Sequence, residues 1–232
     1  MNSIKQIEVI YNNRLVGRLA LTREGLCAFE YSAEWLSSGF SISPFELPLR
    51  SGVFIAKPRP FEGGFGVFDD CLPDGWGLLI LDRYLQQKGI NPRTLTLLDR
   101  LALVGSTGRG ALEFRPDNSV VTRQDFADFE KLALEAEKIL ASDDYMGEGI
   151  EEFQDRGGSP GGARPKIFVR YNDKEWLVKF RAKRDSQSIG VDEYRYSLLA
   201  KECGIEMPSG VLCTLINSTG APRALKRASM AS

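Results

Sequence analysis

The order of local patterns after residue 155 constrains the fold more than any other feature of this chain. A Gly-rich stretch, "DRGGSPGGARPKIFV", runs into an apolar strand at 166–171, and an Asn-Asp turn leads to a second strand at 175–180. A helical pattern over 191–204 and the apolar strand "GVLCTLI" follow. Because adjacent strands joined by a tight turn are antiparallel, this order predicts an α+β fold.

The N-terminal part of the chain also begins with strands. The segment "IEVIYNNRLVGRLAL" alternates around the turn pair Asn12-Asn13, which predicts a β-hairpin over 7–21. A third strand is predicted at 26–31, whereas Pro44 and Pro48 exclude a helix from the loop-rich segment that follows.

Three helices are predicted between these strands and the Gly-rich stretch. Asp74 precedes the first helix as its N-cap, and Gly89 ends that helix. Asn91 is the N-cap of the second helix, with Pro92 at the first helical position, and the third helix has one apolar face. The three helices are expected over 75–88, 91–105 and 123–140.

A change of composition near 142–156 separates this mixed region from the strand-rich segment that begins with the Gly-rich stretch. We therefore predict two domains, residues 1–150 and residues 151–232. A chain of 232 residues can form a substantial core as one large domain or as two small ones.

The chain contains no histidine, and this absence excludes several kinds of site. Ser-His-Asp and Cys-His catalysis, histidine metal sites and imidazole bases are all ruled out. Any chemistry must use carboxylates, lysines, hydroxyls and backbone amides. The four cysteines form no CxxC pair, so we interpret them as reduced thiols of a cytoplasmic protein.

Charge and hydropathy give no support for a nucleic-acid or membrane protein. The net charge is −1, so no overall basic field attracts DNA or RNA. No apolar run approaches the roughly 20 residues that span a bilayer, and the N-terminus has no apolar segment of the signal-peptide kind. We expect no contact with a membrane.

The Gly-rich stretch has two interpretations. Glycines let backbone amides approach an anion closely, and successive N–H groups can form a concave nest for phosphate. The stretch matches neither GxxxxGK[ST] nor GxGxxG, so a flexible linker is an equal alternative on composition alone.

A lysine and a glutamate, spaced like the strand lysine and helix glutamate of protein kinases, favour the phosphate interpretation. Lys179 lies near the end of the second strand among apolar residues, and Glu193 lies in the first turn of the next helix. In protein kinases a strand lysine holds the ATP phosphates and pairs with a glutamate of the following helix. The alternative is a solvent-exposed Lys179 and an ordinary first-turn charge. Asp192 and Glu202 are alternative partners for the lysine.

Three aspartates, Asp69, Asp70 and Asp74, form an acidic cluster before the first predicted helix. We interpret them as charges at the start of a helix, because the chain has no histidine and no second acidic cluster at ligand spacing. The sequence therefore predicts no metal site.

Several segments together resemble a known family. "NNRLVGRLAL", "FEYSAEWLSSGFSISPFELPL", "FDDCLPDGWG" and "STGRGALEF" are similar to the N-terminal subdomain of HipA-type toxin kinases. "GGSPGGARPKIFV", "EWLVKF" and "VDEYRYSLLAKECGIEMP" resemble the beginning of the kinase core of that family. The resemblance covers about residues 7–215 and implies a HipA-type subdomain followed by a truncated, protein-kinase-like N-lobe.

This resemblance implies a function. HipA proteins are serine/threonine kinases of type II toxin–antitoxin modules that use ATP with magnesium and are restrained by a DNA-binding HipB-type antitoxin. Characterised members phosphorylate aminoacyl-tRNA synthetases and stop translation. The resemblance therefore implies a HipB-like antitoxin and a protein substrate as partners, with contact to DNA only through the antitoxin.

The resemblance also implies site residues. Ser159 matches the serine of the Gly-rich loop that is autophosphorylated in the family, and Lys179 matches the nucleotide-binding lysine. The residues expected to bind ATP are Gly157, Gly158, Gly161, Gly162, Lys179 and Glu193.

The chain departs from the family in one respect. The catalytic aspartate, its downstream asparagine and the magnesium-binding aspartate of HipA kinases match no residue here. We therefore expect this chain alone to be inactive as a kinase and to expose a lobe surface through which it self-associates or binds a partner. The alternative is a non-catalytic module that docks an antitoxin or a separate kinase subunit.

Overall fold

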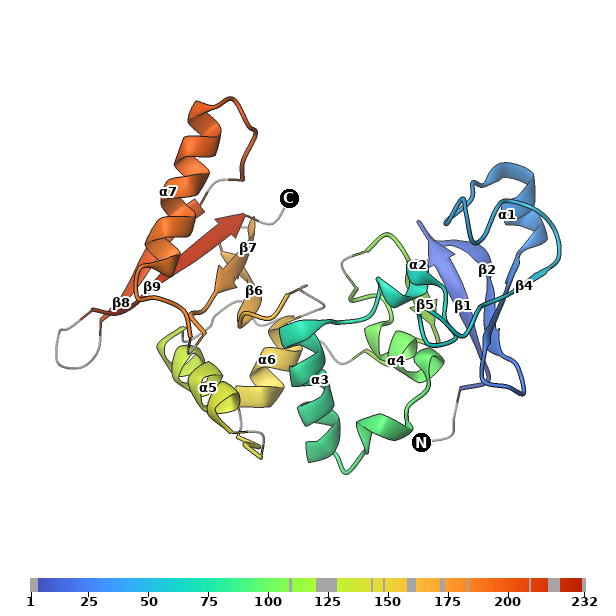
Figure 1. Ribbon diagram of the computed structural model, residues 1–232, viewed down its shortest axis with the longest axis horizontal. Coiled ribbons are helices and arrows are strands. Elements are labelled where there is room, and N and C mark those ends of the chain that lie inside the picture. The colour runs from blue at the N-terminus through green and yellow to red at the C-terminus, as the bar shows by residue number, and fades with distance from the viewer. Residues whose placement is uncertain are drawn as a thin grey trace. The chain divides into compact units, whose positions relative to one another are not determined.

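The computed structural model describes residues 4–108, 110–119, 129–142, 144–147, 149–157, 162–171, 174–182, 184–208, 210–216 and 222–230. The chain forms two compact units. One comprises Met1–Pro73 and Gly89–Val120, and the other comprises Asp74–Lys88 and Val121–Ser232. Strands and helices occur in both units, so the predicted α+β class is confirmed (Figure 1).

The first unit contains a five-stranded antiparallel sheet in the order β4-β3-β2-β1-β5. Its strands are β1 (Gln6–Tyr11), β2 (Arg14–Leu21), β3 (Cys27–Tyr31), β4 (Val53–Ile55) and β5 (Glu113–Arg115). Asn12 and Asn13 have φ angles of 47° and 60°. A type I′ turn needs positive φ at both central positions, so these residues close the predicted hairpin.

Helix α1 (Ala33–Ser38) is not among the predicted helices. The Ser32 side chain accepts a hydrogen bond from the Trp35 N–H at 3.0 Å and begins the helix. The Trp35 indole is buried and its Nε1–H donates to the Phe40 carbonyl at 2.8 Å. One anchored aromatic side chain thus holds a helix too short for a clear periodic signal.

The predicted single helix over 91–105 is wrong. Asn91 caps only a 3₁₀ turn, η1 (Pro92–Thr94), and the chain is extended at Leu95. Helix α4 (Leu97–Val104) then begins afresh after Thr96. The Thr96 side chain accepts from the Asp99 N–H at 3.2 Å and the Asp99 carboxylate accepts from the Thr96 N–H at 3.0 Å. This capping box stabilises a second helix start inside the predicted helix.

Replacing Asp99 by asparagine is expected to lower the free energy of unfolding by about 1–2 kcal/mol at pH 7. Burial alone would raise the pKa of Asp99, but hydrogen bonds from the Ile4 and Thr96 N–H groups outweigh it and lower the pKa. A lowered pKa stabilises the fold above the unfolded-state value of about 4, and this contribution is lost as the pH falls.

Urea denaturation at several pH values tests this prediction, with the exposed Glu24→Gln as control. The difference between Asp99→Asn and the wild type should shrink below about pH 4. A difference that does not change with pH would contradict the role assigned to the carboxylate.

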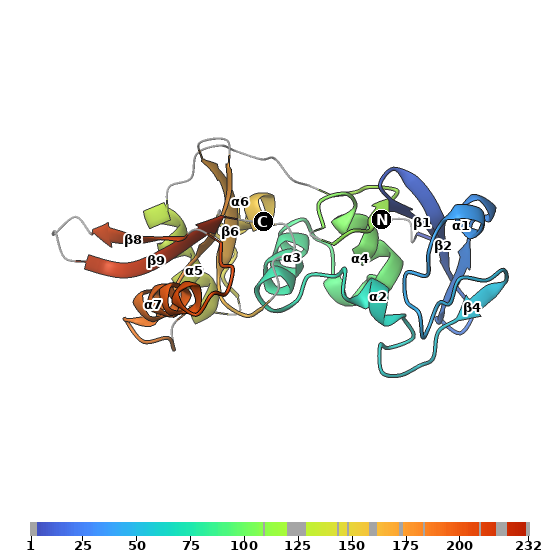
Figure 2. The same cartoon turned by 90° about the horizontal axis from the view of Figure 1, so that it is seen from above.

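The second unit contains a four-stranded antiparallel sheet in the order β6-β7-β9-β8. Its strands are β6 (Lys166–Tyr171), β7 (Lys174–Lys179), β8 (Gly210–Ile216) and β9 (Pro222–Met230), and its long C-terminal helix is α7 (Ile189–Glu202). The strand, strand, helix, strand order predicted after the Gly-rich stretch is therefore confirmed. Helix α7 packs along β8 and β9 (Figure 2).

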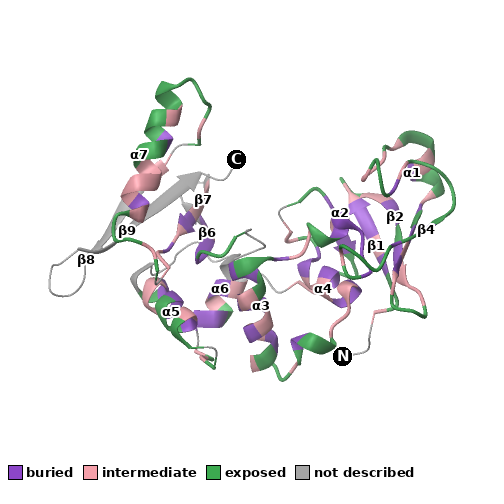
Figure 3. Cartoon of the chain, in the orientation of Figure 1, coloured by how far each residue is buried: buried purple, intermediate pink, exposed green. Residues whose placement is uncertain are grey.

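Three further helices belong to the second unit: α3 (Gly75–Gln87), α5 (Phe129–Ala141) and α6 (Gly149–Gly157). Helix α6 was not predicted, and it occupies most of the segment where the composition changes. It packs on β6 on one side and against α3 and α5 on others. Its side chains Ile150 and Phe153 are fully buried. Part of α6 is accordingly coloured as buried in Figure 3. The predicted domain boundary between residues 150 and 151 stays a prediction.

The core of the second unit is apolar and is built from all three of these helices and the sheet. Its buried side chains are Trp76, Ile80, Leu132, Ala136, Ile139, Ile150, Phe153, Ile167, Val169, Val178 and Phe180. In the part of the chain that the structure describes, no helix has both the length and the apolar character needed to cross a membrane.

Candidate functional site

The candidate site begins with the predicted ion pair. Lys179 is the last residue of β7 and Glu193 lies near the start of α7. The Lys179 Nζ is 3.1 Å from the Glu193 Oε2, so this pairing is confirmed. Neither alternative partner competes: Asp192 accepts a hydrogen bond from the Ser188 hydroxyl at 2.7 Å, and Glu202 is exposed at the other end of α7.

A second lysine faces the same site. In the β6–β7 ladder Lys166 lies directly opposite Lys179, so the two side chains share one face of the sheet. Lys166 is only 8% exposed. Burial lowers the pKa of Lys166, and the positive charge of Lys179 lowers it further. Two like charges at directly opposed positions are unfavourable, and an anion bound beside both would relieve that repulsion.

Lys166 could have been found from the sequence. A two-residue turn at Asn172-Asp173 pairs residues whose numbers sum to a constant, and this register places Lys166 opposite Lys179. The turn itself lies outside the described residues. The predicted hairpin therefore already implies that the lysine at the start of its first strand pairs with Lys179.

The last glycine of the Gly-rich stretch lies against Lys166. Gly162 has a φ of 91°, and a Cβ atom there would stand 3.2 Å from the Lys166 Nζ. The other predicted loop residues differ in position: Gly157 is the last residue of α6, whereas Gly158, Ser159 and Gly161 lie outside the described residues.

Arg164 supports the ion pair from the other side of Glu193. Its guanidinium binds Asp185 through two contacts, Nε–Oδ2 at 2.9 Å and Nη2–Oδ1 at 3.1 Å. The hydrogen bonds from Arg164 hold the pKa of Asp185 below its ordinary value. A third contact joins the Arg164 Nη1 to the Glu193 Oε1 at 3.7 Å. Glu193 is therefore held between two cations, which the sequence pattern did not predict.

Asp74 has a different role from the predicted one. It stands at the N-cap position of α3, but its side chain makes no hydrogen bond to an N–H of that helix. Its Oδ1 accepts instead from the Gly162 N–H at 2.8 Å. The Gly162 carbonyl in turn accepts from the Trp76 N–H at 3.1 Å. The start of α3 is thus bonded to the end of the Gly-rich stretch.

A hollow lies beside the ion pair, bounded by Lys179, Glu193, Arg164, Asp185 and four neighbours, with a volume of about 20 Å³. It has room for about one water molecule. Among the described residues, no group of three cysteine, aspartate or glutamate side chains is placed to hold a metal ion.

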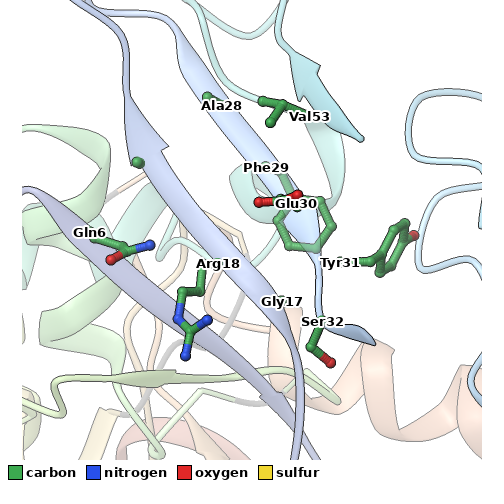
Figure 4. Close-up of a pocket in the computed structure, with 10 residues that line it drawn as sticks. Gln6, Gly17, Arg18, Ala28, Phe29, Glu30, Tyr31, Ser32 and Val53 are labelled. Atoms are coloured by element: carbon green, nitrogen blue, oxygen red, sulfur yellow. The ribbon is translucent and has the colours of Figure 1, made fainter. Parts of the chain in front are cut away.

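A larger hollow of about 310 Å³ lies in the first unit, over β1, β2, β3 and β4 (Figure 4). The small side chains of Ala20 and Ala28 are cross-strand neighbours on its lining. Its one basic side chain, Arg18, is 3.3 Å from the Glu8 carboxylate. None of the predicted site residues lines this hollow, and the candidate site is the lysine cluster of the second unit.

Comparison with known proteins relates the first part of the chain to one family. Residues 7–115 match the family model described as the HipA N-terminal domain. No match was found among the curated proteins. The matched range ends before Lys166, Lys179 and Glu193, so it assigns no role to them.

Proposed function

We propose that this chain, whose residues 7–115 match the HipA N-terminal domain, is part of a HipA-like serine/threonine kinase of a toxin–antitoxin module and binds ATP through its second unit. The observation that carries the ATP proposal is the 3.1 Å ion pair between Lys179 at the end of β7 and Glu193 of α7. In protein kinases a strand lysine paired with a helix glutamate holds the nucleotide phosphates.

The residues around this pair fit a nucleotide phosphate. Lys179 and Lys166 would hold the phosphate oxygens, because both ammonium groups lie on one face of the sheet. Gly162 leaves room for a close approach, since a Cβ there would crowd the Lys166 Nζ at 3.2 Å. Glu193 and Arg164 would keep Lys179 and α7 in register with that phosphate.

Bound ATP would supply the phosphoryl group that the family transfers to a protein hydroxyl. The residues of this chain would bind and orient it. We assign no residue to the general base and no ligand to magnesium, so phosphoryl transfer is not expected of these residues alone. Phosphorylation of Ser159 would add about −1.5 to −2 charges to the Gly-rich stretch that we propose to contact phosphate.

The partners are proposed from the family resemblance. They are a HipB-like DNA-binding antitoxin and a protein substrate of the aminoacyl-tRNA synthetase kind. The matched HipA N-terminal domain supports the toxin–antitoxin context of both partners.

Calorimetric titration of the chain with ATP, ADP and adenosine tests the proposal. We expect the affinity to fall from ATP through ADP to adenosine, because the lysines contact phosphate and not the base. Equal affinity for ATP and adenosine would contradict a phosphate site. No binding of any of the three would favour the alternative, a non-catalytic module that docks an antitoxin or a separate kinase subunit.

A further inference from the structure

We infer that Asp74 is a positioning residue for the phosphate site: its carboxylate holds Gly162, and through Gly162 it holds the place of Lys166. This inference rests on the proposed function, because it concerns the same site. It assigns a role to the Asp-Gly-Trp segment at the start of α3, which lies 88 residues from Gly162 along the chain.

The first support is that both backbone polar groups of Gly162 are bonded to the start of α3. The Gly162 N–H donates to the Asp74 Oδ1 at 2.8 Å. The Gly162 carbonyl accepts from the Trp76 N–H at 3.1 Å. The first N–H groups of a helix have no partner within the helix, so the Gly162 carbonyl also satisfies one of them. Two bonds of opposite direction restrain the peptide groups on both sides of Gly162.

The second support is what Asp74 does not do. An aspartate at the N-cap normally accepts a hydrogen bond from the N2 or N3 N–H of its own helix, and this bond stabilises the helix. Asp74 has the extended backbone of an N-cap residue, with φ −117° and ψ 171°, yet its carboxylate makes no such bond. The side chain is directed to Gly162 at the cost of the local cap.

The third support is the close approach of the two backbones. Gly75 has a φ of 46°, a region that side chains disfavour. A Cβ atom at Gly75 would stand 2.7 Å from both the carbonyl carbon and the oxygen of Gly162. The contact therefore depends on glycine at this position as well as on the Asp74 carboxylate.

The fourth support connects this contact with the lysines. A Cβ atom at Gly162 would stand 3.2 Å from the Lys166 Nζ, so the two residues are close neighbours. The negative charge of Asp74 raises the pKa of that lysine, against the effects of burial and of Lys179. Trp76, whose N–H binds Gly162, is itself fixed by packing: its buried ring lies edge-on against Phe153 with centroids 5.0 Å apart. Displacement of Gly162 would therefore remove a neighbour that restrains the position of the Lys166 side chain.

Two measurements on the full chain test the inference in Asp74→Ala, with Asp70→Ala as the matched control because Asp70 is an exposed neighbour. Hydrogen exchange, read by mass spectrometry, should increase in peptides that contain Gly162. The affinity for ATP should fall about tenfold, because the site would lose the charged hydrogen bond between Asp74 and Gly162 that positions it. Adenosine binding should be unchanged. Asp74→Asn keeps an acceptor oxygen and should restore the slow exchange.

A second variant keeps the carboxylate and removes the close approach. Gly75→Ala should raise exchange at Gly162 at least as much as Asp74→Ala, because a Cβ there would overlap the Gly162 carbonyl.

The outcomes separate the inference from the proposed function. ATP binding that Asp74→Ala leaves at the wild-type affinity, or exchange at Gly162 that does not change, would overturn the inference alone. A wild-type chain that binds no ATP would overturn the proposed function, and the positioning role with it.

Discussion

Replacing Lys166 and Lys179 together by methionine is expected to weaken ATP binding by about 100-fold or more. Each ammonium group would donate a charge-assisted hydrogen bond to phosphate, and such a bond is worth about 1.5–3 kcal/mol. Methionine keeps much of the length and apolar contact of lysine, so the loss reports on the charge. Each single variant should lose part of this affinity.

The double variant leaves Glu193 with a cationic partner, so its fold should stay comparable to that of the wild type. After Lys179 is replaced, the Arg164 Nη1 still lies 3.7 Å from the Glu193 Oε1. Lys201→Met is the matched control, because Lys201 is an exposed lysine of the same helix α7 and lies in its last turn. Calorimetric titration gives the affinities. A double variant that binds ATP as tightly as Lys201→Met would remove the phosphate site from the proposed function.

Replacing Phe153 by alanine is expected to destabilise the second unit by about 3–5 kcal/mol. Phe153 is fully buried on α6, with the Trp76 ring at 5.0 Å and the Phe180 ring at 5.9 Å, both edge-on. Alanine would leave a cavity among three helices and the sheet. Because Phe180 directly follows Lys179 in the chain, the loss should also loosen the end of β7.

Hydrogen exchange by peptide measures this effect locally. Peptides from α6 and β6 should exchange faster in Phe153→Ala, and peptides from the β1–β2 hairpin provide an internal reference in the first unit. Phe45→Ala is the control variant: Phe45 is 99% exposed and should change stability by no more than about 0.5 kcal/mol. Unaltered exchange in α6 would show that this helix does not depend on its phenylalanine.

The fold was predictable from sequence where one local pattern determines it. The turn pair Asn12-Asn13 and the alternation on both sides predict the β1–β2 hairpin, and the same reasoning predicts β6 and β7. Prediction from sequence failed at two places. The helical periodicity over 91–105 continues through Thr96, but the capping box of Thr96 and Asp99 begins a new helix there. Helix α6 depends on Phe153 packing against Trp76, which is distant in sequence.

The site was likewise predictable only where a local spacing pattern determines it. Lys179 and Glu193 are fourteen residues apart on a strand and the helix after it, so a spacing pattern can pair them. The Arg164 contacts to Asp185 and Glu193 have no such pattern. The bond between Asp74 and Gly162 spans 88 residues and uses a side chain whose local position predicts a different partner. Contacts of this kind depend on tertiary structure.

Helix α3 has a consequence for how the chain can be divided experimentally. The matched family range, 7–115, includes α3, but this helix packs with α6 in the unit built mainly from later residues. A fragment that stops at residue 115 would leave Trp76 and Ile80 without the side chains that bury them. The family boundary is therefore not a cleavage point between autonomous folding units. The second unit expressed alone therefore needs the segment 74–88, which contains α3, in addition to the residues from 121 onward.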